Sequence, residues 1–319
     1  MKISFFGVKE SERGYLEAST QKSYPNDEAS LYNESLNIEH IPADTSADII
    51  SVFVGCTVNK EVIEKFPNLK LIVARSTGYD NIDLDECKKR NIVVCNVPSY
   101  GENTVAEQAF ALLLILSRKM IEAVERVRAT KNFSTDGLTG FDLKGKTLGV
   151  LGTGRIGIHS IKIAKGFEMN VIAYDVFQKQ ELQSQLGFTY RTFDEVLAES
   201  DIITVHVPYM KETHHLLNAH AFTIMKPSTY IINTSRGAVV DTGAMFQALK
   251  NNKIAGAGLD VMEDESVMNE EERQMLAMPN VVITPHNAFN TEEAIERILE
   301  TTIQNISAFL KDTPQNIVK

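Results

Sequence analysis

Glycines with a recurring spacing stand near the middle of the chain, in the run Gly152-Thr153-Gly154-Arg155-Ile156-Gly157. A strand-like segment (147–151) leads into this run and a helix-like segment (155–167) follows it. In such a turn the first glycine permits a tight bend, the second lets the backbone approach a pyrophosphate, and the third lets the helix pack closely on the strand. The amino end of the helix would add free N–H groups and a partial positive charge. The run therefore predicts a dinucleotide-binding site.

Asp175 strengthens this prediction, because it directly follows a second β-branched segment at 170–174. Its carboxylate would accept hydrogen bonds from ribose hydroxyls and repel a 2′-phosphate, which favours NAD over NADP. Arg155 is of a type that accommodates a 2′-phosphate, but it stands inside the glycine run and not after Asp175. A purely structural turn is the alternative, and it leaves the position of the acid unexplained.

Three further polar side chains, Arg236, Glu265 and His286, follow predicted strands in the second half of the chain. The carboxyl ends of parallel strands meet at one edge of a sheet, and ligands bind there. A hydride transfer to a carbonyl needs a forked cation that polarises the carbonyl and holds an anion. It also needs a proton donor near neutral pH, which an imidazole supplies and a neighbouring carboxylate orients. Arg236, His286 and Glu265 fit these three roles.

Each of these residues also has a plainer interpretation. Arg236 alone is typical of a surface ion pair, His286 of a loop residue bonded to backbone, and Glu265 of a solvated acidic run. Only their combination downstream of a dinucleotide site favours catalysis. The weaker histidine candidates are expected on the surface of a helix: His214, His215 and His220.

Short β-rich runs alternate with helical patterns along the whole chain, which predicts parallel strands joined by crossover helices. The first set of strands is expected at 2–6, 49–54, 69–75 and 92–96. The second set is expected at 147–151, 170–174, 202–207, 229–233, 257–260 and 281–284. A long helical stretch at 103–130 separates the two sets, and a last amphipathic helix is expected at 291–310.

We therefore predict an α/β fold of two doubly wound parallel-sheet domains with a cleft between them. Residues 102–289 would form a Rossmann NAD-binding domain. Residues 1–101 and 290–319 would form a smaller, discontinuous, flavodoxin-like substrate domain, because the last helix could return to the first set of strands. Local signals place helix starts at Asn103, at Thr192 with its capping-box glutamate, and at Asp241.

The composition of the 319-residue chain is that of a globular protein, with 43% hydrophobic and 23% charged residues. A net charge of −10 argues against a nucleic-acid partner, since phosphate contacts need clustered Lys and Arg. The three cysteines match no metal-ligand spacing and suit a reducing compartment. The longest apolar run, 109–116, is too short to cross a bilayer, and the amino terminus lacks the apolar core of a signal peptide. We expect a cytoplasmic protein with no metal site and no membrane partner.

Taken in order, these motifs resemble those of the D-isomer-specific 2-hydroxyacid dehydrogenase family over nearly the whole chain. Besides the glycine run, the shared motifs are Arg75-Ser76-Thr77-Gly78-Tyr79-Asp80-Asn81-Ile82-Asp83, Thr104-Val105-Ala106-Glu107, His206-Val207-Pro208, Asn233-Thr234-Ser235-Arg236-Gly237, Gly258-Leu259-Asp260-Val261 and Thr284-Pro285-His286. The resemblance implies that Arg236 binds the carboxylate and keto oxygen of the substrate, that His286 is the acid and base, and that Glu265 orients it.

The resemblance also implies further contacts. Backbone amides of Thr77 and Gly78 would hold the substrate carboxylate, and Asp260 would hold the nicotinamide carboxamide. The residues expected to contact NAD are Thr104, Gly152, Thr153, Gly154, Arg155, Ile156, Gly157, Asp175, His206, Val207, Pro208, Thr234, Ser235, Asp260 and His286. Family members are commonly dimeric through the nucleotide domain, which implies a homodimer with the 103–130 helix as a contact.

Within the family the chain is similar to the D-lactate dehydrogenases. Tyr100 stands where those enzymes have a tyrosine that touches the substrate, and Phe289 matches a phenylalanine that closes on a small side chain. Ordinary packing is the alternative for both. Asn290 departs from the pattern, since a tyrosine is frequent there. The segment 53–57 has no arginine of the kind that binds phosphate in phosphoglycerate-type relatives, and Glu265 in place of glutamine argues against a formate dehydrogenase.

We therefore expect NADH-dependent reduction of a short 2-keto acid, pyruvate in particular, to the D-2-hydroxy acid. Glyoxylate, hydroxypyruvate and branched 2-keto acids are the alternative substrates. The alternative of another class is an NADH-sensing, corepressor-like binding protein, which the lack of extended tails disfavours.

Overall fold

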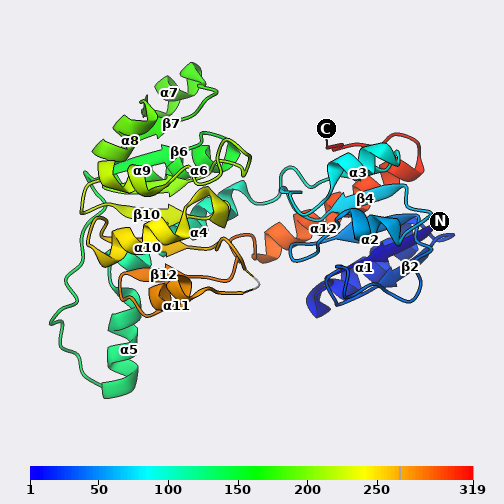
Figure 1. Cartoon of the computed structure of the whole chain (residues 1–319), viewed down its shortest axis with the longest axis horizontal. Coiled ribbons are helices and arrows are strands. Elements are labelled where there is room, and N and C mark those ends of the chain that lie inside the picture. Colours follow the sequence, from blue (N-terminus) through cyan, green and yellow to red (C-terminus); the bar gives the residue numbers. More distant parts are fainter. Residues whose placement is uncertain (266, 319) are drawn as a thin grey trace. The chain divides into compact units, whose positions relative to one another are not determined.

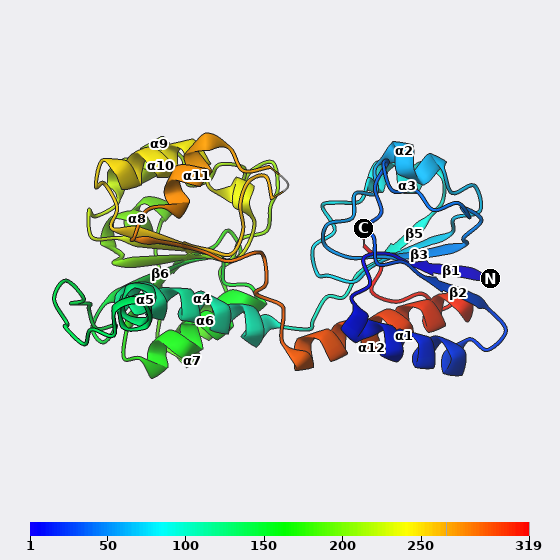
Figure 2. The ribbon, with the colours of Figure 1, turned by 90° about the horizontal axis from the view of Figure 1, so that it is seen from below.

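The computed structural model describes residues 1–265 and 267–318, and the chain divides into two compact units. The first unit combines Met1–Tyr100 with Thr291–Lys319, and the second is Gly101–Asn290. Each unit is a parallel β-sheet with helices on both faces (Figures 1 and 2). This is the doubly wound α/β architecture predicted from the alternating pattern. None of the helices in the described residues combines the length and apolar character needed to cross a bilayer.

The first unit is built on a five-stranded sheet with the order β2-β1-β3-β4-β5. Its strands are β1 (Lys2–Phe5), β2 (Glu28–Leu31), β3 (Ile49–Val52), β4 (Leu71–Ala74) and β5 (Val93–Cys95). Its helices are α1 (Glu10–Ser23), α2 (Lys60–Glu64), α3 (Leu84–Lys89) and α12 (Glu292–Leu310). The helices α1 and α12 cover one face, and α2 and α3 cover the other (Figure 2). Because both faces are covered, β3 and β4 are buried at every position.

The last helix, α12, belongs to the first unit although it comes from the other end of the chain. Leu299, Ile303 and Ile306 recur along one side of α12 and are buried. They share a hydrophobic core with Ile3 and Phe5 of β1. The amphipathic pattern of α12 is therefore explained by its packing on this sheet.

The second unit is built on a seven-stranded sheet with the order β12-β11-β10-β9-β6-β7-β8. Its strands are β6 (Thr147–Leu151), β7 (Asn170–Tyr174), β8 (Thr189–Tyr190), β9 (Ile202–Val205), β10 (Tyr230–Asn233), β11 (Gly256–Leu259) and β12 (Val281–Ile283). Its helices are α4 (Glu102–Ser117), α5 (Met120–Thr130), α6 (Arg155–Gly166), α7 (Gln180–Leu186), α8 (Phe193–Glu199), α9 (Ala219–Ile224), α10 (Thr242–Lys250), α11 (Glu270–Leu276) and the 3₁₀ turn η1 (Gly237–Val239). The six strands predicted for this part of the chain are present. The additional strand is β8, which has only two residues and so leaves no alternating pattern.

The helical stretch predicted at 103–130 is two helices, α4 and α5, rather than one. Lys119 separates them with a left-handed backbone, φ 48°. The returning chain bonds to the end of α4, where Phe141 N donates to Ser117 O at 2.9 Å. A Cβ on Gly140 would lie 2.0 Å from the same oxygen. A distant segment thus takes up a terminal carbonyl of α4, which helical periodicity does not reveal.

Two of the three predicted helix starts are confirmed. Thr192 caps α8 in a capping box, and Asp241 caps α10. Asn103 does not cap α4, because the helix already begins at Glu102. The Asn103 side chain instead donates to Glu107 Oε1 at 3.1 Å, one turn along the same helix.

Candidate active site

The glycine run connects β6 to α6 in the second unit. Gly152 has a φ of +96°, and a Cβ there would lie 2.9 Å from the carbonyl carbon of His206. A Cβ on Gly157 would lie 2.0 Å from the Gly152 oxygen. At Gly154, by contrast, a Cβ would meet nothing within 4 Å. A side chain at the first or third position would therefore collide with backbone, so both positions require glycine. The middle one leaves open space beside the amino end of α6, where a pyrophosphate fits.

Asp175 follows β7, and its carboxylate turns back to the glycine run. Its Oδ2 accepts hydrogen bonds from Thr153 N at 2.6 Å and Thr153 Oγ1 at 3.0 Å. Its Oδ1 accepts one from Phe177 N at 2.8 Å. The Thr153 hydroxyl also lies 2.8 Å from the Tyr190 hydroxyl of β8. The acid is thus held beside the loop, where a ribose diol next to a bound pyrophosphate would lie. Sequence reasoning missed Tyr190, because β8 was itself missed.

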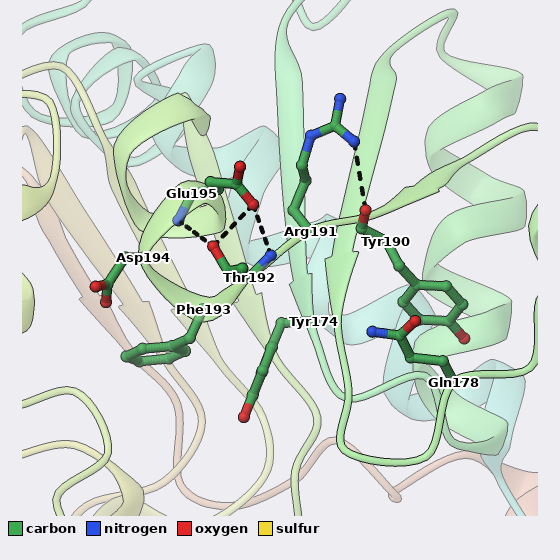
Figure 3. Close-up of a pocket in the computed structure, with 8 residues that line it drawn as sticks. All are labelled: Tyr174, Gln178, Tyr190, Arg191, Thr192, Phe193, Asp194 and Glu195. Carbon is green, nitrogen blue, oxygen red and sulfur yellow. Dashed lines mark hydrogen bonds between the residues drawn. The ribbon is translucent and has the colours of Figure 1, made fainter.

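Tyr174, the residue before Asp175, lines a pocket of about 630 Å³ at the β7–β8 edge of the sheet (Figure 3). The lining residues are Tyr174, Gln178, Tyr190, Arg191, Thr192, Phe193, Asp194 and Glu195. Thr192 and Glu195 are bonded to each other in the cap of α8, and Arg191 donates to the Tyr190 carbonyl at 3.4 Å. The pocket is separated in the sheet from β10, β11 and β12, which carry the other predicted site residues.

The strands β10, β11 and β12 are neighbours, so their carboxyl ends lie side by side, as the prediction of a shared edge requires. Arg236 follows β10, Asp260 follows β11 and His286 follows β12. Asn233 shapes the turn before Arg236: its Nδ2 donates to Arg236 O at 2.9 Å, and its Oδ1 accepts from Ser235 N at 3.0 Å. Asn233 therefore fixes the backbone of the turn that carries Arg236.

The His286 imidazole is paired with Glu265. Nδ1 of His286 lies 2.9 Å from Glu265 Oε2, and because a carboxylate only accepts, Nδ1 carries the proton of this bond. The other ring nitrogen, Nε2, is then available for proton exchange with a ligand. His286 has a left-handed backbone, φ 48°, and its N–H donates to the Asp260 carbonyl at 2.8 Å. Such a conformation persists only where the surroundings hold it, and it recurs at functional sites.

Asp260 is one of the groups that hold this loop, a role that sequence reasoning missed. Its carboxylate is fully buried and accepts from Asn287 N at 3.1 Å, from Ala288 N at 2.8 Å and from the Thr284 hydroxyl. The buried charge is thus compensated by donors on both sides of His286. Asp260 therefore joins the end of β11 to the loop after β12, whatever else it binds.

Thr234, in the turn between β10 and Arg236, has a buried hydroxyl with no hydrogen-bond partner among the described residues. Buried polar groups in folded proteins are nearly always satisfied. An unsatisfied hydroxyl at the carboxyl end of a strand fits a site that is completed by a bound ligand. Together with the open space at Gly154, it indicates that the residues present can accommodate a dinucleotide.

His206, which follows β9, is predicted to contact NAD. In the structure its Nε2 lies 2.9 Å from both Ser160 Oγ of α6 and Thr204 Oγ1 of β9. Burial lowers the pKa of His206 to about 3, so the ring is neutral at physiological pH. The His206 backbone lies against the glycine run at Gly152.

The other residues predicted to contact NAD lie around the same turns. Arg155 and Ile156 open α6, Val207 and Pro208 follow β9, Ser235 precedes Arg236, and Thr104 lies in the first turn of α4. The exposed Arg155 guanidinium lies 3.5 Å from Glu102 Oε1, also in the first turn of α4. All of these positions belong to the second unit.

Thr77, Gly78 and Tyr100 belong to the first unit, whereas Phe289 belongs to the second. Side-chain bonds hold the loop after β4: the Thr77 hydroxyl donates to a backbone carbonyl at 2.9 Å, and Ser76 Oγ donates to the Gly78 carbonyl at 2.6 Å. Phe289 is 9% exposed, so most of its side chain is buried.

The chain is similar to known proteins in both sequence and structure. A sequence model described as D-isomer specific 2-hydroxyacid dehydrogenase, NAD binding domain, matches residues 110–288. The chain is 44% identical over 278 residues to a glyoxylate reductase of Thermococcus litoralis, which covers 85% of this chain and 83% of the relative. It is 36% identical over 320 residues to a D-lactate dehydrogenase of Escherichia coli, with 96% of each covered. The crystal structure of D-lactate dehydrogenase from Aquifex aeolicus, complexed with NAD and lactic acid, is similar with a TM-score of 0.89. That pair is 37% identical and covers 98% of this chain and 96% of the other.

Proposed function

Since the chain belongs to the D-isomer-specific 2-hydroxyacid dehydrogenase family and is an NAD-dependent 2-keto acid reductase, we propose that its substrate is pyruvate and its product D-lactate. Two features support pyruvate: the near full-length similarity to D-lactate dehydrogenases, and the Tyr100 and Phe289 positions that match their pattern. The observation that carries the chemistry is the bond between His286 and Glu265, which fixes one ring nitrogen and leaves the other for substrate.

In this proposal each group has one task. The glycine run and Asp175 would hold NADH, which would supply a hydride to the carbonyl carbon. Arg236 binds the carboxylate and carbonyl oxygen of the keto acid through its forked guanidinium and stabilises the charge that develops on that oxygen. His286 Nε2 delivers the proton to the same oxygen, and Glu265 stabilises the protonated ring through Nδ1. One hydride and one proton are consumed for each D-lactate formed.

The first unit supplies the remaining substrate contacts in this proposal. Backbone amides of Thr77 and Gly78 hold the carboxylate, and the bonds that fix their loop keep those amides in place. Residues 1–101 and 290–319 thus act as the substrate domain, and 102–289 as the NAD-binding domain. Glyoxylate is the second candidate substrate, because the Thermococcus relative with 44% identity is a glyoxylate reductase.

A substrate panel tests the assignment. NADH oxidation is followed by its absorbance with pyruvate, glyoxylate, hydroxypyruvate, 2-ketoisocaproate and phenylpyruvate. We expect the highest kcat/KM with pyruvate and D-lactate as the product. A preference for another acid would change the proposed substrate but not the proposed reaction. The panel needs several acids because pockets discriminate between small apolar groups by only about 1–3 kcal/mol per methylene. No turnover with any of them would favour the binding-protein alternative.

The His286→Ala variant tests the role of the imidazole. We expect kcat to fall by about 10²–10⁴, the usual contribution of a general acid, while NADH binding is retained. Binding is measured by the fluorescence of NADH. Near-normal turnover would contradict the assignment of His286.

We also propose that the protein forms a homodimer through α5 of the second unit. No residue of α5 is buried, and its apolar side chains Met120, Ile121, Val124 and Val127 are 38–48% exposed. Contiguous apolar surface of this kind is typical of an interface. Light scattering should give twice the mass of 35.5 kDa, and Val124→Glu should reduce it to the single-chain mass. A wild-type monomer would refute this proposal.

A cytoplasmic location is the last element of the proposal. Cys56, Cys87 and Cys95 are all buried and unpaired. Free thiols of this kind suit a reducing compartment, whereas secreted proteins commonly pair them. Cell fractionation would test the location.

A further inference from the structure

His215 is bonded to the loop that carries Glu265. Its Nε2 lies 2.7 Å from Glu263 Oε1, and its Nδ1 lies 4.0 Å from Asp241 Oδ2. Since a carboxylate only accepts, His215 Nε2 is the donor to Glu263. The sequence predicted a helix surface residue here, and this prediction is wrong. His215 lies in a turn between β9 and α9 and is about one-third exposed.

The backbone of this turn is bonded to the segment that follows Arg236. His215 N donates to Ala238 O at 2.9 Å, and Leu217 N donates to Val239 O at 3.1 Å. His215 also has a left-handed backbone, φ 50°, which is unfavourable for a residue with a side chain and is retained only where neighbours hold it. The turn therefore has one defined position relative to the Arg236 segment.

The loop after β11 is in contact with the same segment. A Cβ on Gly237 would lie 2.0 Å from the Met262 carbonyl carbon and oxygen, so the two backbones touch. Met262 is itself part of the hydrophobic core. Glu263 follows it and reaches His215, and Glu265 lies two residues further on. The bond to His215 thus anchors the loop two residues before the carboxylate that meets His286.

We propose that His215 is a positioning residue for the reduction: it binds Glu263, fixes the loop 261–265 and so directs Glu265 Oε2 at His286 Nδ1. The inference rests on the proposed acid–base role of His286. His215 touches neither substrate nor cofactor in this scheme. His215 affects the reaction only by keeping Glu265 Oε2 at 2.9 Å from His286 Nδ1.

The effect should appear in the chemical step rather than in stability or binding. A partly exposed pair such as His215 and Glu263 contributes little to the stability of the fold. A displacement of about 1 Å at a catalytic group, however, can lower a rate by about 10²-fold. Losing the anchor should therefore lower kcat by about tenfold to a hundredfold, with the KM for NADH unchanged.

Two substitutions at His215 separate the loss of its hydrogen bond to Glu263 from the change of side-chain shape. His215→Leu removes the donor, whereas His215→Gln places an amide nitrogen near the position of Nε2 and can still donate to Glu263. We expect kcat to fall in the leucine variant and to return to within a few-fold of wild type in the glutamine variant. His220→Leu, at an exposed position of α9, is the control and should leave kcat unchanged. Glu263→Leu breaks the same bond from its other end and should reproduce the effect, so one poorly folding variant does not decide the test. Equal losses in the leucine and glutamine variants would overturn the inference.

A double-mutant cycle tests the route of the effect. If His215 acts through Glu265, then His215→Leu should lose most of its effect on kcat when Glu265 is already replaced by glutamine. An undiminished effect in that background would overturn the inference.

A magnetic-resonance measurement does not depend on turnover. With ¹⁵N-labelled histidine, the His286 Nδ1–H signal should be sharp in the wild type and in His215→Gln. In His215→Leu it should broaden through faster exchange with water, and an unchanged signal would overturn the inference. If the wild type reduces no keto acid, the proposed function fails, and this signal still decides whether His215 holds the two groups together.

Discussion

The histidine that follows β9 makes the stability of the protein depend on pH. His206 Nε2 is bonded to the hydroxyls of Ser160 and Thr204, and its Nδ1 is buried without a hydrogen-bond partner among the described residues. Burial disfavours the charged ring and lowers the pKa of His206 from 6.5 to about 3. The folded protein therefore holds this ring neutral under conditions in which the unfolded chain takes up a proton.

The direction and size of the effect follow from linkage. The pKa in the folded state is depressed, so the contribution to stability is fully present above pH 6.5. It is lost progressively as the pH falls toward 3, because only the unfolded chain binds the proton in that range. Between pH 7 and pH 5 the free energy of unfolding should fall by about 2 kcal/mol from this residue alone. At pH 5 the folded ring is still neutral, so only the unfolded chain takes up the proton in this interval.

His206→Gln is the matched variant, because its amide nitrogen can replace Nε2 beside the two hydroxyls but does not titrate. Urea unfolding of the protein without cofactor, at pH 7 and pH 5, gives the free energy of unfolding at each pH. The cofactor is left out because its binding would add its own contribution to stability. We expect the wild type to lose about 2 kcal/mol more than the variant between the two pH values. If the wild type and the variant lose the same free energy of unfolding, the assignment of a buried neutral imidazole is refuted.

Three further predictions concern the glycine run, the acid and the thiols. Gly154→Ala should leave the stability of the free protein within about 0.5 kcal/mol of wild type but weaken NADH binding. Gly157→Ala should destabilise the protein by about 1–3 kcal/mol, because its Cβ would meet backbone. Denaturation and NADH titration separate the two, and similar behaviour of both variants would contradict the role of Gly154. Asp175→Ala should raise the NADPH to NADH ratio of kcat/KM by about tenfold, equivalent to about 1.4 kcal/mol, and an unchanged ratio would rule out its contact with the ribose. Burial raises the pKa of Cys87 and Cys95 to about 11, so thiolates are scarce at neutral pH. A thiol reagent should find no reactive cysteine in the folded protein and three after unfolding, and rapid labelling of the folded protein would contradict this.

Much of the fold was predictable because it depends on local or periodic features of the chain. The alternation of β-rich and helical segments specified two parallel sheets, and Gly152 and Gly157 marked a turn that no other residue fits. The caps at Thr192 and Asp241 were visible for the same reason, since each bonds to backbone within its own helix turn. The adjacency of Arg236, Asp260 and His286 followed from one rule, that parallel strands end at the same edge.

Several features that sequence reasoning missed depend on partners far away in the chain. The break between α4 and α5 depends on Phe141, which bonds to Ser117 after the chain has turned back. The place of Asp260 at the base of the His286 loop depends on donors that only the completed sheet brings to it. His215 meets Glu263 only because a turn, a 3₁₀ segment and a loop pack together beside Arg236. The sequence by itself determined which side chains could act and on which strand ends they stand. Tertiary packing alone decided which neighbours hold them, because a hydrogen bond between distant segments leaves no periodic mark in either one.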